Sequence, residues 1–480
     1  MFESLAWLQA MALAPMLVAG LIACFVSFAS PSRGLKLIVL TLPLYFTSNT
    51  LTAGLARFFG GSSQVPIFAD LLTVCTFFGI VASRTRRQAW STPNWISWAF
   101  LLFLAVSVAS LANADEPLRG LMALISYAQL VLLVFVVETL VTNEKMLVSV
   151  MRYWLYSYAV VLSAGIIGIL TLYLGIDNYT NAGGQQVRAT FRFPNQLSIY
   201  LVITSALLWP LASARALGNK KRRLIQGSLP LMLAVLYYSG SRSGVTAFAA
   251  ASVASLLFNR RGRQAYILIG VASLCVLGLA LHSVGNTGDL SAAGARYGEM
   301  YTAVGQSGSN DFFAFHSAMN ATAIQAVADH PVLGGGIGGV LNSEVEIGSH
   351  YEIHNTYLGI AGQTGLLGFA AAALIVTLAV LNCLKARKGS RSPFVRAVAE
   401  GCIAALAGVA VHAYGNFDWR IRHLWLLLAL SSGLRIAAER TRWAAMPVKI
   451  VVPEPWRPNR TSGDRLGTGP LESDPQIYRA

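Results

Sequence analysis

Apolar residues in this chain fall in long unbroken runs rather than in stripes that repeat every 3.6 residues. A stripe is typical of a helix with one face against a soluble core, whereas an unbroken run is typical of a helix surrounded by lipid. Short polar segments separate the runs, and many of these segments contain lysine or arginine. The pattern therefore predicts an all-α polytopic membrane protein.

The number of spans follows from the length of the runs, because one crossing needs roughly 20 apolar residues. We expect about 12 transmembrane helices, with 13 as the upper count. The first 30 residues lack a basic N-terminal region and lead into further spans, so a cleavable signal peptide is not expected. The runs cover residues 5–29, 35–53, 66–84, 93–112, 119–141, 150–175, 195–213, 224–240, 243–258, 265–283, 355–384, 398–416 and 423–438.

Charge patterning predicts which side each loop faces. The net charge of +15 could suggest a nucleic-acid partner, but the basic residues lie in short loops between apolar runs. Such loops mark the cytoplasmic side of a membrane protein, so we expect no nucleic acid. The basic clusters are 84–87, 220–223, 260–263, 385–391 and the stretch from Arg440.

Alternation then places segments 177–193, 239–243, 283–354 and 415–422 on the opposite side, which is the periplasm in a bacterium. The side of the N-terminus stays open, because it depends on the span count. We expect a bacterial inner-membrane protein with four parts: an N-terminal transmembrane bundle (1–283), a large periplasmic loop (284–354), C-terminal transmembrane helices (355–440) and a disordered cytoplasmic tail (441–480).

The segment 283–354 is about 70 residues long, and loops of that length are often functional. Residues 312–329 have apolar positions at helical spacing, and Asp329-His-Pro331 with the glycines of 334–339 indicates a helix end and a tight turn. The loop is therefore predicted to contain short helices that cover the membrane domain.

Arginines gather in the segments predicted to face the periplasm. Arg188 and Arg192 flank Ala-Thr-Phe, and Arg242 lies in a Gly-Ser-Arg-Ser-Gly turn between two apolar runs. For Arg242 the alternative to an anionic ligand is an anchor in lipid headgroups, and for Arg188 and Arg192 it is a plain surface charge. Together they favour a phosphate or diphosphate group, because a guanidinium binds two phosphate oxygens at once.

His354 has three open interpretations: a general base, a diphosphate contact or a structural histidine. A zinc site is disfavoured, because in His350-Tyr-Glu-Ile-His354 the glutamate lies about 200° around a helix from the first histidine. The five cysteines lie within apolar runs and form no Cys-x-x-Cys pair. We therefore expect neither a metal nor a cofactor.

Four further residues are candidate substrate contacts. Asn355 and Tyr357 follow His354 directly, and Arg296 lies in the long loop, where it is a candidate to close over an anionic ligand. His316 lies in the same loop and is a candidate either for substrate contact or for support of the loop.

Four short motifs resemble those of the bacterial O-antigen ligase and polymerase superfamily. His354-Asn355, nine further residues and Gly365-Leu-Leu-Gly368 match its histidine motif, whose glycines we expect to smooth the start of the next helix. Ser241-Arg-Ser-Gly244 resembles its Ser-Arg turn, and the stretch from Arg188 to Asn195 resembles its arginine loop. Asp329-His-Pro331-x-x-Gly334-x-Gly336 resembles a stretch of its periplasmic loop.

The resemblance implies a GT-C-like membrane glycosyltransferase that acts at the periplasmic face without metal or nucleotide sugar. Its donor would be a glycan on undecaprenyl diphosphate, and its acceptor a hydroxyl group. Arg188 and Arg242 would hold the diphosphate, with Arg192 as an alternative to Arg188. His354 would activate the acceptor hydroxyl or help to hold the diphosphate.

Several activities fit these expectations. Within the superfamily, a ligase transfers the glycan to lipid A-core in lipopolysaccharide biosynthesis, a polymerase joins lipid-linked repeat units of O-antigen or exopolysaccharide, and a third group modifies protein hydroxyls. The histidine motif slightly favours ligase activity over polymerase activity. The rival from another class is a flippase of lipid-linked glycans, for which Asp70 and Glu138 within or near apolar runs are the best features.

Overall fold

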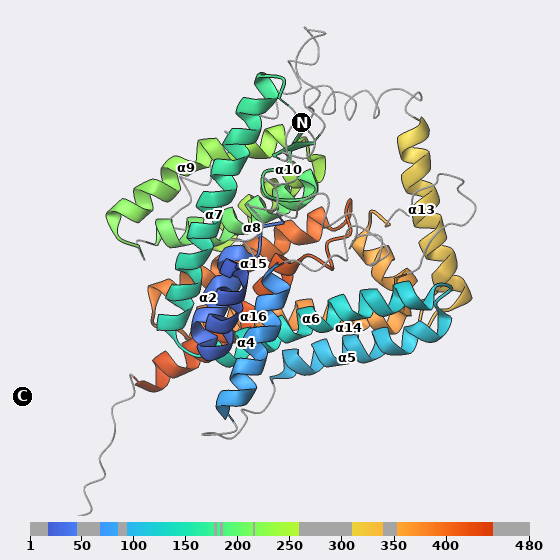
Figure 1. Ribbon diagram of the computed structural model, residues 1–480, viewed down its shortest axis with the longest axis horizontal. Coiled ribbons are helices and arrows are strands. Elements are labelled where there is room, and N and C mark those ends of the chain that lie inside the picture. The colour runs from blue at the N-terminus through green and yellow to red at the C-terminus, as the bar shows by residue number, and fades with distance from the viewer. Residues whose placement is uncertain are drawn as a thin grey trace, which may run out of the picture. The chain divides into compact units, whose positions relative to one another are not determined.

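Helices make up nearly all of the regular structure in the computed structural model (Figure 1). The structure describes residues 18–45, 68–84, 94–176, 180–182, 186–214, 217–258, 310–338 and 353–444. The described residues up to Trp443 belong to one compact unit. Arg296, the predicted span 265–283 and the predicted tail lie outside the described residues, apart from the tail's first four residues in the last helix.

The described helices follow one another along the chain. After a helix at Val18–Ala29, the elements are α2 (Pro31–Thr41), α4 (Phe68–Arg84), α5 (Trp95–Ser110), η1 (Leu111–Asn113), α6 (Pro117–Leu140), α7 (Glu144–Tyr173), β1 (Asn181–Ala182), β2 (Gln186–Val187), α8 (Pro194–Ser213), α9 (Asn219–Tyr238), α10 (Arg242–Phe258), α13 (Asn310–Asp329), α14 (Thr356–Gly389), α15 (Pro393–His412) and α16 (Arg422–Ala444). The two strands form a short antiparallel pair.

Six of the described helices are long and apolar enough to cross a membrane. They are Trp95–Asn113, Pro117–Leu140, Glu144–Tyr173, Pro194–Ser213, Thr356–Gly389 and Pro393–His412. The predicted all-α membrane architecture is therefore confirmed, whereas the count of 12 and the GT-C-like arrangement stay predictions. Helices α9 and α16 cover two predicted spans and fall outside this group, because basic residues occupy the start of α9 and the end of α16.

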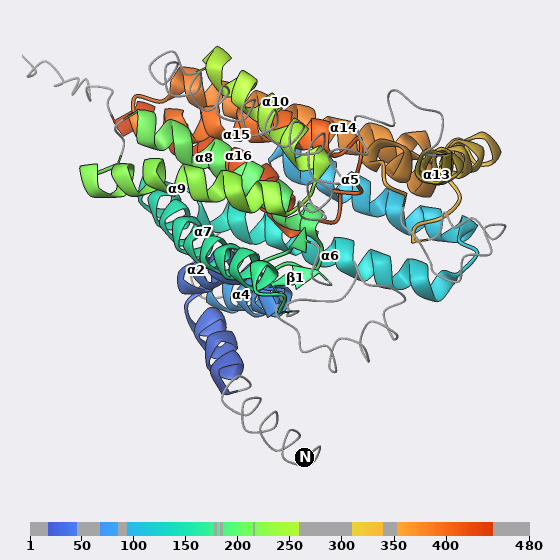
Figure 2. The ribbon, with the colours of Figure 1, turned by 90° about the horizontal axis from the view of Figure 1, so that it is seen from above.

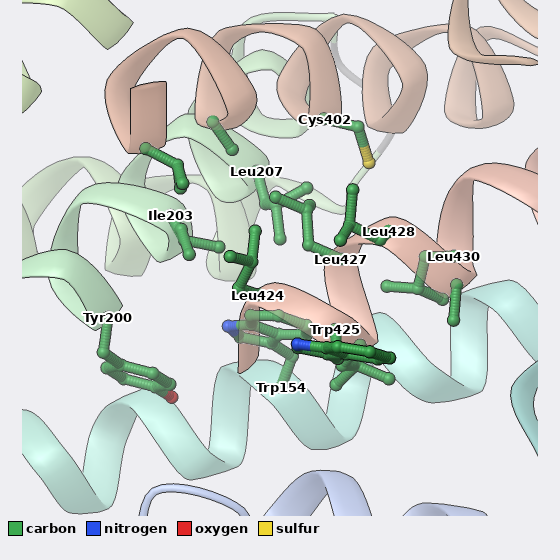
Figure 3. Packing of buried hydrophobic residues seen from close by; sticks show 14 of the residues in the cluster. Trp154, Tyr200, Ile203, Leu207, Cys402, Leu424, Trp425, Leu427, Leu428 and Leu430 are labelled. Atoms are coloured by element: carbon green, nitrogen blue, oxygen red, sulfur yellow. The ribbon is translucent and has the colours of Figure 1, made fainter. Parts of the chain in front are cut away.

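Helix α15 packs against α8, α10 and α14. Gly401 allows the close approach to α8, because a Cβ at this position would lie 2.6 Å from the Ala206 carbonyl oxygen. Small residues allow membrane helices to pack this closely. The same core includes Trp154 of α7, which donates to Thr204 of α8 over 3.0 Å, and Trp425 of α16 (Figure 3).

Within residues 310–338, the part of the predicted helical loop that the structure describes, there is one helix. Helix α13 ends at Asp329, as the sequence predicts, and it packs against α14 (Figure 2). A turn with left-handed glycines at 334, 336 and 338 follows it. This arrangement brings the stretch after α13 against the helix that follows His354.

Candidate active site

The histidine motif lies at the N-terminus of α14. Asn355 is the N-cap, and its side-chain oxygen accepts hydrogen bonds from the backbone N–H groups of Tyr357 (3.0 Å) and Leu358 (3.2 Å). An asparagine at this position satisfies two of the N–H groups that a helix start leaves without partners. The motif therefore presents His354, which is half-buried, one residue before a capped helix start.

The two glycines of this motif do not smooth the start of a helix, and that expectation was wrong. Gly365 has φ 69° and ψ −173°, which breaks α14 nine residues after its start. The Pro331 carbonyl accepts from Leu366 N–H (2.9 Å), and Gly335 N–H donates to the Gly362 carbonyl (2.8 Å). The nine-residue spacing is thus the length of a half-helix that ends where the turn after α13 docks.

Arg242 is the first residue of α10 and is half-buried. Gly240 makes the tight turn before it with φ 63°, and the Ser241 hydroxyl accepts from Gly244 N–H over 3.2 Å. This hydroxyl therefore caps the helix start, as serine does at many N-termini. The turn holds Arg242 at the positive end of the helix dipole of α10.

The arginine loop, residues 188–193, is fixed by contacts with a distant segment. Thr190 accepts from Tyr45 N–H (3.0 Å) and donates through its hydroxyl to the Pro43 carbonyl (2.8 Å). Phe191 is fully buried, with its ring centroid 5.4 Å from that of Tyr45 and 5.3 Å from that of Tyr200. The half-buried Arg192 and Arg188 therefore extend from an anchored loop.

Arg192 lies over the Phe193 ring, with 5.5 Å between the guanidinium carbon and the ring centroid. Helix α8 begins directly after this loop, at Pro194. The arginine loop thus leads into a third helix start.

The turn between α15 and α16 joins these three helix starts through Asn416. Its side-chain N–H group donates to Ser243 of α10 (2.6 Å), and its side-chain oxygen accepts from Asn195 of α8 (2.6 Å). Its backbone carbonyl accepts from the hydroxyl of Thr356 in α14, also over 2.6 Å. The structure therefore brings together three motifs that lie far apart in the sequence.

The place where the starts of α8, α10 and α14 meet around Asn416 is called the junction below. A buried pair of side chains supports it from within the core. The Nδ1 atom of His412 lies 2.6 Å from a carboxylate oxygen of Asp418, and its Nε2 atom lies 3.3 Å from the Ser198 hydroxyl. This order of aspartate, histidine and serine resembles a hydrolytic triad. Ser198 and His412 are fully buried and Asp418 is 1% exposed, so no substrate reaches the serine. We interpret the three residues as a structural brace.

Two arginines in the same turn are also buried. Arg422 pairs with Asp70 through contacts of 2.6 to 3.0 Å. Arg420 donates to Gln363 over 3.1 Å, and its guanidinium lies over the rings of Phe417 and Tyr127. Both side chains hold the turn to neighbouring helices.

Tyr357 lines a cavity of about 280 Å³ beside this junction. Its hydroxyl donates to the Ala410 carbonyl over 2.6 Å. Thr356 and Asp418 border the cavity, and most of the remaining wall consists of apolar side chains from α14 and α15. The cavity therefore has a polar edge at the junction and an apolar body between two membrane-spanning helices.

Not every predicted site residue is placed. His316 belongs to α13, and the structure describes its backbone but not its side chain, while Arg296 lies outside the described residues. Within the described parts of the chain, no group of three or more His, Cys, Asp or Glu side chains is arranged to hold a metal ion. The roles of all the predicted site residues stay predictions.

Sequence reasoning missed His412, Asn416 and Asp418. The available signal was weak: segment 415–422 shares a predicted side with the other motifs and contains several polar residues between two apolar runs. That pattern is also typical of a solvated turn, so it gave no reason to single out one amide.

The junction has the electrostatics of an anion site. The N-termini of α8, α10 and α14 meet there, and each carries partial positive charge from its helix dipole. Arg242 and the arginine loop add full positive charges next to two of these helix starts. The arrangement suits a ligand with several negative oxygens.

In a comparison with family models, the model described as O-antigen ligase matches residues 227–373. This match confirms the resemblance to the O-antigen ligase and polymerase superfamily. It includes Arg242, the turn after α13 and the histidine motif, whereas the arginine loop and Asn416 lie outside it. A search of the curated proteins found no match.

Proposed function

We propose that this protein of the O-antigen ligase and polymerase superfamily transfers a glycan from undecaprenyl diphosphate to an acceptor hydroxyl at the periplasmic face of the inner membrane. Ligation to lipid A-core is the leading activity. Polymerisation of lipid-linked repeat units of O-antigen or exopolysaccharide is the second candidate.

One observation carries this proposal: the starts of α8, α10 and α14, with their arginines and His354, are joined through Asn416. A diphosphate bears several negative oxygens, and helix N-termini and guanidinium groups are the protein groups that bind such oxygens best. The adjoining cavity with its apolar body supports a substrate that has a lipid part.

The proposed reaction is a single displacement at the anomeric carbon of the donor sugar. The acceptor oxygen forms the new glycosidic bond while the bond from the anomeric carbon to the diphosphate oxygen breaks. Arg242 and Arg188, or Arg192 in place of Arg188, stabilise the negative charge on the departing undecaprenyl diphosphate. His354 accepts the proton from the acceptor hydroxyl or contacts the diphosphate.

The flippase alternative has a weaker basis. Asp70, its best feature, forms a buried ion pair with Arg422, and Glu138 accepts a hydrogen bond from Ser97. Both carboxylates thus have structural contacts between helices. Arg242→Ala and His354→Ala cells that accumulate lipid-linked donor on the periplasmic side would favour the transferase, whereas cytoplasmic accumulation would favour the flippase.

The direct test uses purified protein, a synthetic undecaprenyl-diphosphate glycan and EDTA, with lipid A-core or additional donor as acceptor. Product on lipid A-core indicates a ligase, and a ladder of longer lipid-linked glycans indicates a polymerase. We expect Arg242→Ala and His354→Ala to lower turnover by about 100-fold or more, as the loss of a group that stabilises the transition state does.

Matched controls separate these effects from general damage. Arg396→Ala removes an exposed arginine near the start of α15, on the predicted cytoplasmic side, and His330→Ala removes an exposed histidine of the turn after α13. Both are expected to keep full turnover. Folded wild-type protein that forms neither product would contradict the proposed transfer.

A further inference from the structure

In the described part of the chain, Asn416 forms hydrogen bonds to all three helix starts that carry candidate site residues, those of α8, α10 and α14. It is only 5% exposed and lies in the turn between α15 and α16. Two of its bonds come from the side-chain amide and one from the backbone carbonyl, and each measures 2.6 Å.

The chemistry of the amide explains why asparagine suits this position. One planar group donates to the Ser243 hydroxyl and accepts from the Asn195 amide at the same time. Asparagine and glutamine are the side chains that carry a carbonyl oxygen and an NH₂ group together, and glutamine is longer by one methylene. An alanine here would leave two half-buried polar side chains, Ser243 and Asn195, without this partner.

The backbone around Asn416 is held in place by its neighbours. Its amide also approaches the His412 carbonyl at 3.4 Å, and Asp418 N–H donates to the Thr356 hydroxyl over 2.7 Å. The His412–Asp418 pair thus braces the turn on both sides of Asn416. The amide is therefore presented in one fixed orientation.

Each bond of Asn416 ends close in sequence to a candidate substrate contact. Ser243 follows Arg242 directly, Asn195 lies three residues after Arg192, and Thr356 lies two residues after His354. The amide is too buried to reach a substrate, but any shift of its turn moves all three helix starts against one another. A misplacement of about 1 Å can cost roughly 100-fold in rate.

We propose that Asn416 is a positioning residue that sets the spacing of Arg242, the arginine loop and His354 for the transfer reaction. This inference rests on the proposed function. Asn416 does not touch the substrate, and its effect on turnover passes through the groups that do.

The first test is a set of double-mutant cycles on folded, monodisperse protein. Asn416→Ala is expected to lower turnover by roughly 100-fold in the wild-type background. If it acts through Arg242 and His354, it costs much less in the Arg242→Ala and His354→Ala backgrounds. Equal fold-losses in all three backgrounds would overturn the proposal, because general structural damage is additive with the loss of either group.

Asn382→Ala is the matched control, since Asn382 is a buried asparagine within the later part of α14. It is expected to keep wild-type turnover in every background. A loss as large as that of Asn416→Ala would mean that removal of any buried amide has this effect, and would overturn the assigned role.

A second measurement is independent of transfer. Spin labels at the exposed positions Thr246 of α10 and Leu366 of α14, in a cysteine-free background, report the distance between the two helices. Asn416→Ala is expected to shift or broaden the distance distribution, and Asn382→Ala to leave it unchanged. An unchanged distribution in Asn416→Ala overturns the positioning role, whereas wild-type protein without transfer activity overturns only the proposed function.

Discussion

Gly365 provides a sharp test of the half-helix described for α14. Its backbone lies in a region that glycine alone adopts readily, with φ 69° and ψ −173°. Alanine at this position would place a Cβ 2.5 Å from the Leu333 nitrogen and closer still to the Val332 carbonyl. Both neighbours are backbone atoms, so the contact cannot be relieved by rotating a side chain.

The expected cost combines two effects. Backbone strain of this kind costs about 1–3 kcal/mol, and overpacking against a rigid neighbour about 1–3 kcal/mol more. We therefore expect Gly365→Ala to lose about 2–6 kcal/mol of unfolding free energy. The control is Gly227→Ala in α9, where a Cβ would meet nothing within 4 Å. Alanine there is expected to stabilise by about 0.5–1 kcal/mol.

Both variants are measured by reversible unfolding in mixed micelles, followed by tryptophan fluorescence. Donor binding is measured on the folded fraction, because a displaced turn after α13 also moves the start of α14. If Gly365→Ala is as stable as wild type within about 1 kcal/mol, well below the sum of the two costs, the break in α14 is not a required feature of the fold.

Three further predictions use the same unfolding assay. Asp70→Asn is expected to lose about 3–5 kcal/mol of unfolding free energy, because it leaves the buried Arg422 without its carboxylate. The double variant Asp70→Leu with Arg422→Met should recover most of this loss. If the losses of the two single variants add up in the double variant, the pairing is contradicted. Glu439→Gln breaks an exposed i, i+4 pair and should change stability by less than about 0.5 kcal/mol, so a larger change would show that surface pairs matter here. Asn355→Ala should lose about 1 kcal/mol with the helix cap, whereas Asn355→Ser keeps the cap without adding charge; weaker donor binding by a fully stable Asn355→Ser variant would identify Asn355 as a substrate contact.

The long helices were predictable because their signal is local. An apolar run of span length fixes a helix whatever it packs against, so α5, α6, α7, α8, α14 and α15 lie at the predicted positions. Helix starts carry a local signal too. Pro194, Ser241 and Asn355 are residues that favour a helix N-terminus, and each lies at or next to one.

The junction was not predictable, because its contacts join distant parts of the chain. Asn416 lies 173 residues from Ser243 and 221 residues from Asn195, and no local pattern indicates such pairings. The break at Gly365 escaped prediction for a similar reason. A glycine within an apolar run looks the same whether the helix continues or ends, and the carbonyl of Pro331 that receives Leu366 N–H comes from another segment.

The position of Asn416 also sets an order of events during synthesis. The start of α8 leaves the ribosome first, then the starts of α10 and α14, and Asn416 follows 221 residues after Asn195. At roughly 5–20 residues per second, this gap lasts about 11–44 seconds. From residue 242 onward the nascent chain carries Arg188, Arg192 and Arg242 but still lacks the residue that ties the three helix starts together. A ribosome that stalls before codon 416 therefore leaves a protein with the cations of the site and without its assembled geometry.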